Sequence, residues 1–137
     1  MTARRFMLDT ASASFVLRGE GRVAERLTAH APSEICLSAL SLSELRFGAD
    51  KRRSKRLHKL IDTIVADIDV LSFDPAAATM FGRVCAALQA KGSPIGMFDT
   101  LIAAHAISLN LTLVTNNTKH FKQVPGLKIQ NWFHDAG

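Results

Sequence analysis

Residues 94–106 read Pro94-Ile95-Gly96-Met97-Phe98-Asp99-Thr100-Leu101-Ile102-Ala103-Ala104-His105-Ala106, a proline–glycine turn that leads one acidic residue into an almost wholly apolar helix. A helix with so little polar surface is covered by protein on most sides. Asp99, at its start, is therefore either an N-cap or a charge placed at the lip of a cleft. The remainder of the chain has to distinguish these two roles.

The composition is that of one globular domain, which we expect to span residues 1–137. Hydrophobic residues make up 47% of the chain and charged residues 21%. No apolar run approaches the ~18 residues of a membrane span, and Arg4 and Arg5 are not followed by the apolar region of a secretory signal. We therefore expect a cytoplasmic protein. Cys36 and Cys85 lack metal-binding or CxxC spacing, which predicts two reduced core thiols.

The net charge is the first indication of function. The chain carries a formal charge of +5 and has a pI near 9.7. A basic surface concentrates polyanions, so nucleic acid or an acidic protein is a candidate partner. Small domains also carry net charge merely for solubility. Charge alone leaves both explanations open.

Apolar patterns along the chain alternate between strand and helix. Short apolar runs predict strands at 5–8, 34–38, 70–73, 111–115 and 127–131. Helical spacing occupies 11–17, 23–31, a segment from 41 to about 48, 57–68 and 76–91, and the segment after Asp99. Asp74-Pro75 is a typical helix start. This order predicts an α/β domain with a mainly parallel central sheet of about five strands, helices on both faces, and a site at the carboxyl ends of the strands.

Three acidic residues fall where such a site would form. Asp9 ends the first strand, Glu44 lies in the helix after the second strand, and Asp99 precedes the apolar helix. Each alone has an ordinary structural explanation. Ser41-x-x-Glu44 matches a capping box, Asp99 could cap its own helix, and Asp9 could belong to a strand-to-helix turn.

Clustering of the three acids would require a cation. Two carboxylates about 4 Å apart repel by ~4 kcal/mol at an effective dielectric constant of about 20. Oxygen-only ligands suit Mg²⁺ or Mn²⁺, which keep several waters and can bridge to a phosphate. Such an ion orients a water toward a phosphodiester and neutralises charge on the leaving oxygen. A basic chain with an acidic cleft is what a metal-dependent nuclease requires.

Several further motifs accompany these acids in a fixed order. They are Phe6-Met7-Leu8-Asp9-Thr10, 38–48 (SALSLSELRFG), Pro94-Ile95-Gly96-x-x-Asp99, 102–106 (IAAHA), 113–118 (LVTNNT), 124–127 (VPGL) and Asn131-Trp132. In these motifs the chain resembles the PIN-domain ribonucleases, specifically the VapC-type toxins of bacterial toxin–antitoxin pairs. The resemblance runs almost end to end.

The resemblance implies roles for individual residues and for partners. Asp9, Glu44 and Asp99 would be the metal ligands for Mg²⁺ or Mn²⁺, and Asn117 would take the fourth acidic position. Thr10, Thr115 and Asn116 would contact the substrate beside them. The family cleaves single-stranded or loop RNA, often transfer RNA, as a homodimer that a cognate VapB-type antitoxin inhibits. Arg18 and Arg46 are candidate contacts to substrate or antitoxin, because each follows a site acid by a few residues.

The chain departs from the pattern of the family at four positions. Ala11 stands where an asparagine is usual, Met97-Phe98 replaces a proline–asparagine pair, and Asn117 replaces an acid. Loss of the amide at position 11 removes a group that would orient Asp9 or a metal-bound water. The alternative is therefore a weakened PIN module that binds antitoxin or RNA without efficient cleavage.

Other residues suggest competing functions. His58 and His105 could serve a metal-free ribonuclease. His105 lies about 120° around an ideal helix from Asp99, however, in the most apolar helix, which favours a core or interface histidine. The basic run 51–56 is more typical of a solvated helix start than of a phosphate contact. A receiver-type phosphoacceptor at Asp9 lacks its usual acid pair, and Trp132-Phe133 is typical of core packing.

Overall fold

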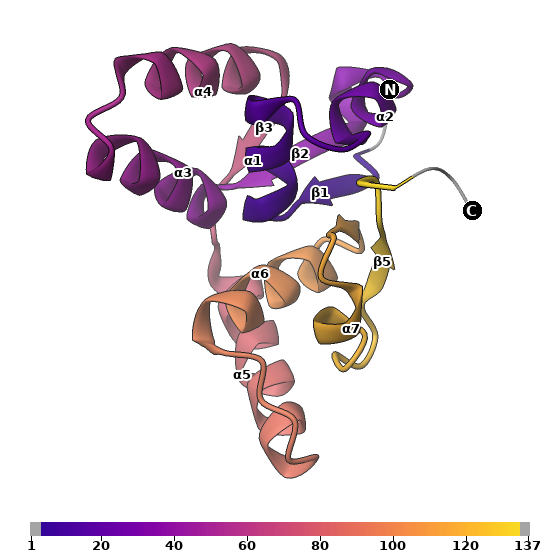
Figure 1. Ribbon diagram of the computed structural model, residues 1–137. Coiled ribbons are helices and arrows are strands. Elements are labelled where there is room, and N and C mark those ends of the chain that lie inside the picture. The colour runs from indigo at the N-terminus through magenta and orange to yellow at the C-terminus, as the bar shows by residue number, and fades with distance from the viewer. Residues whose placement is uncertain (1–3, 135–137) are drawn as a thin grey trace.

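Five short parallel strands form the centre of the protein in the computed structural model, which describes residues 4–134 (Figure 1). The order across the sheet is β3-β2-β1-β4-β5, and every neighbouring pair is parallel. This confirms the predicted α/β class and the parallel five-stranded sheet. The strands are β1 (Phe6–Leu8), β2 (Ile35–Ser38), β3 (Asp69–Leu71), β4 (Thr112–Val114) and β5 (Lys128–Gln130).

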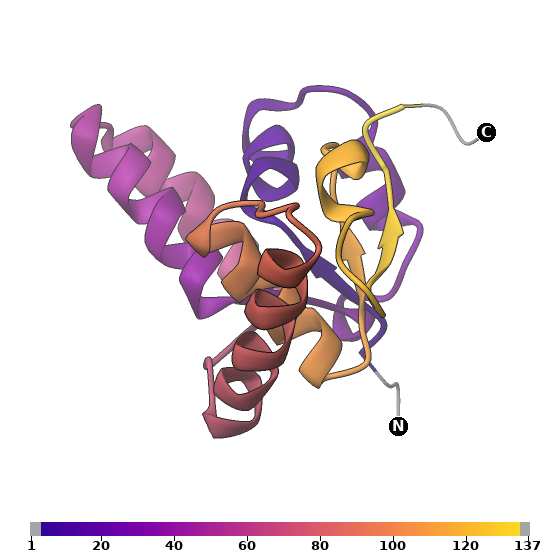
Figure 2. The same ribbon diagram turned by 90° about the horizontal axis from the view of Figure 1, so that it is seen from below.

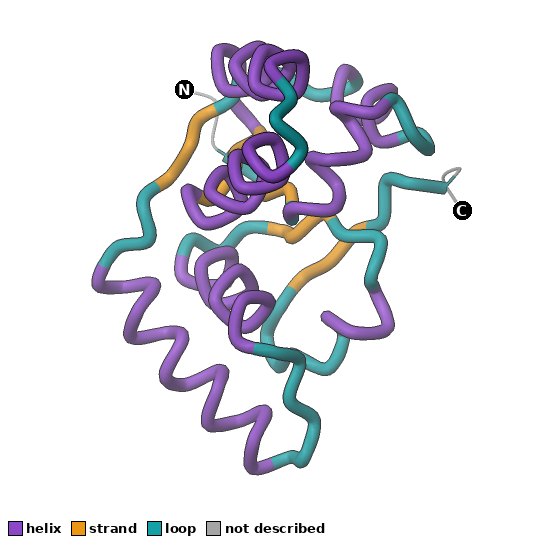
Figure 3. The backbone as a smooth tube through the Cα atoms, turned by 60° about the vertical axis from the view of Figure 1, so that its left-hand side comes forward, coloured by secondary structure: helices purple, strands orange, loops and turns teal. Residues whose placement is uncertain are grey.

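Helices cover both faces of the sheet, as predicted (Figures 1 and 2). One face carries α1 (Thr10–Arg18), α2 (Val23–Thr28), α3 (Ala39–Lys51) and α4 (Lys55–Asp67). The other face carries α5 (Pro75–Ala90), α6 (Met97–Ser108) and the short α7 (Thr118–Phe121). A single 3₁₀ turn, η1 (Pro32–Glu34), leads into β2. In Figure 3, α5 and α6 are joined by a loop that runs back along the molecule.

The central strand β1 is buried on both faces, which explains its continuous apolar sequence. Phe6 and Leu8 pack with α1, α3 and α4, whereas Met7 points into the cluster formed with α5 and α6. Met7 pairs with Cys36 of β2 and Leu113 of β4 in the sheet. Because its neighbours on both sides are strands, the carboxyl end of β1 lies at the middle of the sheet edge.

Helix starts agree with the sequence at α5 and differ at α3 and α6. Asp74 caps α5 and accepts a hydrogen bond from Ala77 N at 2.9 Å. Helix α3 begins earlier than expected, because Ser38 caps it, so Ser41 lies inside the helix and forms no capping box. Helix α6 begins after Gly96, whose φ of 92° suits glycine.

Asp99 is therefore not the N-cap of its helix. It lies in the first turn, where a carboxylate is favoured by the helix dipole and is free to point elsewhere. The N-cap interpretation of Asp99 is wrong, and the cleft interpretation remains.

The C-terminal segment completes the core beside β1. Trp132 is 1% exposed and its ring contacts those of Phe6 and His30. Phe133 packs edge-on against Phe15 and lies so close to Gly21 that a Cβ there would be 2.5 Å from the ring. The prediction of core packing for these two aromatic residues is confirmed.

The two cysteines were expected to be reduced thiols in the core. Both thiols are free. Cys36 is buried, and burial raises the pKa of its thiol to about 12, whereas Cys85 is only half-buried. The core location is thus confirmed for Cys36 alone.

Within the described part of the chain, no helix is long and apolar enough to cross a membrane. The domain extent of 1–137 stays a prediction.

Candidate active site

A cleft of about 490 Å³ opens at the carboxyl edge of the sheet, between α1, α3, α4 and α6. The predicted acids Asp9, Glu44 and Asp99 all line it, together with Asn117. They come from four separate parts of the chain: the end of β1, helix α3, the first turn of α6 and the segment after β4. Its lining also includes Thr10, Ala11, Arg18, Arg52 and an apolar wall that contains Leu17, Leu45, Leu57 and Ile61.

Asp9 is the most constrained of the acids. It is 6% exposed and caps α1, with Oδ1 accepting a hydrogen bond from Ser12 N at 2.7 Å. Its own N–H donates to the Val114 carbonyl of β4 at 3.0 Å. Burial raises the pKa of Asp9 and the charge of Asp99 adds to this, while hydrogen bonds from Thr115 and Ser12 act in the opposite direction. A nearby cation would therefore stabilise the ionised carboxylate.

Thr115 connects Asp9 to Asn117. Its hydroxyl accepts a hydrogen bond from Asn117 N at 3.0 Å and hydrogen-bonds the Asp9 side chain. Thr115 is fully buried, so it supports the site from behind and does not face a substrate. Asn116 is also directed elsewhere, since its Oδ1 accepts a hydrogen bond from Asn131 Nδ2 at 3.0 Å. Both placements differ from the substrate contacts expected from the sequence.

Glu44 is exposed and reaches α1 through a single hydrogen bond. Its Oε1 accepts from the Thr10 hydroxyl at 2.5 Å. Thr10 is the first residue of α1, directly after Asp9, so this contact links α1 to α3 across the cleft. Thr10 thus orients a site carboxylate.

Asp99 is paired with a histidine that sequence reasoning did not identify. His120 Nε2 lies 3.0 Å from Asp99 Oδ2 and 2.7 Å from the Ile95 carbonyl oxygen. His120 lies on α7, three positions after Asn117, which directly precedes that short helix. That spacing of one helical turn is the only local signal that could have indicated His120.

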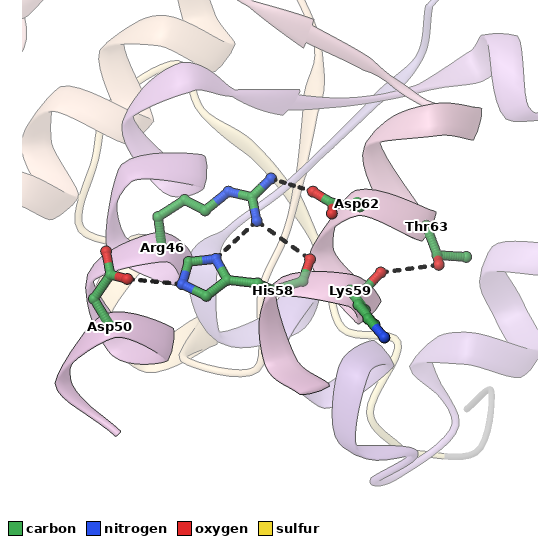
Figure 4. A network of polar contacts seen from close by, with 6 residues as sticks. All are labelled: Arg46, Asp50, His58, Lys59, Asp62 and Thr63. Carbon is green, nitrogen blue, oxygen red and sulfur yellow. Dashed lines mark hydrogen bonds and ion pairs between the residues drawn. The ribbon is translucent and has the colours of Figure 1, made fainter. Parts of the chain in front are cut away.

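The two predicted arginines are in different surroundings. Arg18 lines the cleft, where its guanidinium lies 3.4 Å from Glu20. Arg46 instead joins α3 to α4 (Figure 4) and is not among the residues that line the cleft. It donates to Asp62 Oδ1 at 2.6 Å, and to the ring and carbonyl oxygen of His58 at 3.0 and 3.2 Å. The structure therefore does not bring Arg46 to the candidate site.

The two histidines of the metal-free alternative do not meet. His58 hydrogen-bonds Asp50 through Nε2 at 2.8 Å and lies in the same network as Arg46 (Figure 4). His105 is 1% exposed, with its Nδ1 2.9 Å from the Ser38 hydroxyl. Neither lines the cleft. The core assignment of His105 is confirmed.

The donor set fits a hard divalent cation, although the carboxylates are not yet gathered around one point. Among residues 4–134, no three side chains of the ligand-forming types stand close enough to hold an ion as they lie. Asp9, Glu44 and Asp99 nevertheless provide only oxygen donors, and the charge of Asp99 adds to the cost of ionising Asp9. Mg²⁺ and Mn²⁺ bind through one or two carboxylates plus waters.

Comparison with known proteins places this arrangement in a family. The PIN domain family model matches residues 6–127. The tRNA(fMet)-specific endonuclease VapC of Shigella flexneri is 41% identical over 130 residues, which cover 93% of this chain and 98% of that protein. Ribonuclease VapC2 of Rickettsia felis is 37% identical over 99 residues, covering 72% and 74% of the two chains.

Solved structures show the same fold. A crystal structure of DNA-bound VapBC from Salmonella typhimurium superposes with a TM-score of 0.88 at 35% identity, covering 94% of this chain and 98% of that one. VapBC-1 from nontypeable Haemophilus influenzae gives a TM-score of 0.81 at 29% identity over 93% and 97% of the chains. The chain therefore belongs to the PIN-domain family and, within it, to the VapC group.

Proposed function

We propose that this protein is a metal-dependent endoribonuclease that acts as the toxin of a toxin–antitoxin pair. One observation carries the proposal: Asp9, Glu44, Asp99 and Asn117, from four parts of the chain, line one cleft. The relatives named as VapC ribonucleases support the same activity. The basic charge of +5 favours an RNA substrate.

The metal would be Mg²⁺ or Mn²⁺, held by Asp9, Glu44 and Asp99. Bound there, the ion would supply an activated water and would neutralise charge on the scissile phosphate. The chain itself contributes orientation. Ser12 N and Thr115 fix the Asp9 carboxylate, and Thr115 at the same time holds the backbone of Asn117. The Asn117 side chain, exposed at the cleft, would hydrogen-bond the substrate.

The substrate and partners follow from the relatives. We propose single-stranded or loop RNA as the substrate, with transfer RNA as one class, since a relative is named for tRNA(fMet). A VapB-type antitoxin is the proposed inhibitor, because the structural neighbours are VapBC assemblies. The exposed Phe47 and Met97, each 66% exposed, are available for protein contacts. A homodimer and a cytoplasmic location stay predictions.

The test is cleavage of labelled RNA by the purified protein with Mg²⁺ or Mn²⁺ and with chelator. Cleavage should require the ion and should be lost in both Asp9→Asn and Asp99→Asn, which keep side-chain size while removing charge. Cleavage that persists in chelator, or in both variants, would reject the metal-nuclease proposal.

A second candidate is a PIN module that binds RNA or antitoxin and cuts poorly. Ala11 lines the cleft beside Asp9 without a hydrogen-bonding group, and Thr10 and His120 already occupy two of the three carboxylates. Ala11→Asn decides between the candidates. A large gain of cleavage in this variant over an inactive parent favours the binding module, and an active parent favours the nuclease.

A further inference from the structure

A second depression adjoins the acidic cleft on the far side of Asn117. It measures about 340 Å³ and lies between the loop before α6 and helix α7. Asn117 lines both hollows, and His120 lines the second while its Nε2 touches Asp99 of the first. A chain of nucleotides passing through the acidic cleft therefore meets this depression next.

The ring of His120 forms a fixed wall of the depression. Nε2 is held by the Ile95 carbonyl oxygen at 2.7 Å and by Asp99 at 3.0 Å, and the ring meets Phe121 edge-on at 5.5 Å. Pro94 adds an apolar surface beside it. A nucleobase can stack on this flat ring. Because the ring is already held in place, stacking costs the His120 side chain little conformational entropy.

The rim of the depression is cationic and polar. Lys119 is exposed on it and, among residues 4–134, forms no ion pair. Lys91 reaches the same rim, where its Nζ donates to the Gln123 carbonyl oxygen at 2.7 Å. The side chains of Gln123 and Ser93 offer hydrogen-bonding groups to a base edge. This combination suits a nucleotide, with its phosphate on lysine and its base against His120.

We propose that this depression is an RNA subsite that binds the nucleotide next to the scissile phosphate. Lys119 contacts the phosphate of that nucleotide and Gln123 reads its base. The inference rests on the proposed ribonuclease function, because that function places the scissile phosphate at Asp9 and Asp99.

The experiment compares two charge reversals on neighbouring positions. Lys119→Glu changes the rim of the depression, and Lys122→Glu changes an equally exposed lysine that does not line it. Binding of a short fluorescein-labelled single-stranded RNA is measured by anisotropy in chelator, over a range of salt concentrations. We expect Lys119→Glu to weaken binding about tenfold and to lower the salt slope by about one, with an effect of about twofold for Lys122→Glu.

A second measurement uses Gln123→Ala with Mg²⁺ and RNAs that vary on either side of the cleaved bond. Discrimination among bases should fall at one flanking position only. Equal effects of the two lysine variants together with unchanged base preference would overturn the subsite, as would a parent that binds no RNA. A parent that binds RNA with the Lys119 dependence but never cuts would reject the ribonuclease function and show that the depression binds RNA without a scissile phosphate beside it.

Discussion

Asp9 and Asp99 line the same cleft, but their surroundings have little in common. Asp9 is 6% exposed and is held by Ser12 N and by Thr115. The Asp99 side chain is 41% exposed and is paired with His120. The Asp9 carboxylate is therefore held rigidly at the sheet edge, whereas the Asp99 carboxylate lies nearer the surface and can adjust; we propose both as ligands of one ion. Such a pair allows an ion to bind a preformed carboxylate first and to recruit the other.

The largest expected effect concerns the rigid side. Asp9→Asn keeps an acceptor for Ser12 N, because asparagine caps helices about as well as aspartate. We expect single-turnover RNA cleavage to fall by about 10²–10³-fold, the usual loss when one preorganised charge-stabilising group is removed. Thermal unfolding in chelator should change little.

The matched control is Asp74→Asn, which alters an equivalent cap on α5 away from the cleft. Its cleavage rate should equal that of the parent. A rate for Asp9→Asn within tenfold of the parent would contradict the role of Asp9 and leave its helix cap as its whole function.

The next effect concerns the adjustable side, where His120 positions Asp99. His120→Ala should weaken Mn²⁺ binding about 10–100-fold, as expected when a partner that orients a ligand is lost. His120→Gln retains a donor and should recover part of the affinity. Calorimetric titration with Mn²⁺ measures this without RNA. Lys122→Ala, a few residues further along, should bind Mn²⁺ as the parent does, and equal affinity in His120→Ala would refute the positioning role.

A smaller effect separates the two arginines. Arg18→Ala should raise KM for RNA about three- to tenfold, because Arg18 lines the cleft and a cation there contacts phosphate. Arg46→Ala should leave KM within about twofold of the parent, since its guanidinium is held by Asp62 and His58. The Arg46 variant should instead lose at most about 1 kcal/mol of stability, as is usual for partly exposed ion pairs. A rise of KM in Arg46→Ala alone would reverse this assignment.

The smallest effect tests a buried ionisable group outside the cleft. Burial lowers the pKa of His105 below its ordinary value of 6.5, opposed by the charge of Asp74 and a hydrogen bond at Ser72. The folded state therefore favours the neutral ring, and burying that ring carries no protonation penalty above pH 6.5. As the pH falls below 6.5, the unfolded chain binds a proton that the folded chain resists, so the free energy of unfolding decreases. His105→Gln should lose less stability than the parent on acidification.

Urea unfolding at about pH 7.5 and about pH 5.5 measures that difference, with the exposed His134→Gln as control. The control should show the acid dependence of the parent. An identical loss in His105→Gln and the parent would mean that folding does not lower the pKa of His105.

Much of the fold could be predicted because its determinants are local. The five apolar runs correspond to the five strands, and Asp74-Pro75 marks the start of α5. Helix starts were less certain at α3 and α6. There the strongest apparent cap residues, Ser41 and Asp99, lie inside the helix, because Ser38 and Gly96 end the preceding segments. A cap depends on where the chain leaves the extended conformation, which tertiary packing settles.

The candidate site divides in the same way. Asp9, Glu44 and Asp99 could be selected from the sequence as the acids expected near the carboxyl edge of a parallel sheet, and Asn117 from the resemblance to the PIN-domain ribonucleases. Their supports could not. Thr115 lies more than a hundred positions from Asp9, and His120 belongs to a helix of four residues with no periodic signal. Arg46 looked equivalent to Arg18 until α4 proved to carry its partners Asp62 and His58.

The sequence of this protein contained the order of its strands and helices, the three candidate acids Asp9, Glu44 and Asp99, and the resemblance to PIN-domain proteins. The three-dimensional packing added which acid is rigid and which is adjustable, and which cations face the cleft. The physical reason is the distance along the chain over which each kind of interaction acts. Periodicity and capping act over a few residues, whereas the hydrogen bonds that hold Asp9 and Asp99 join segments that meet only when the sheet and its helices assemble.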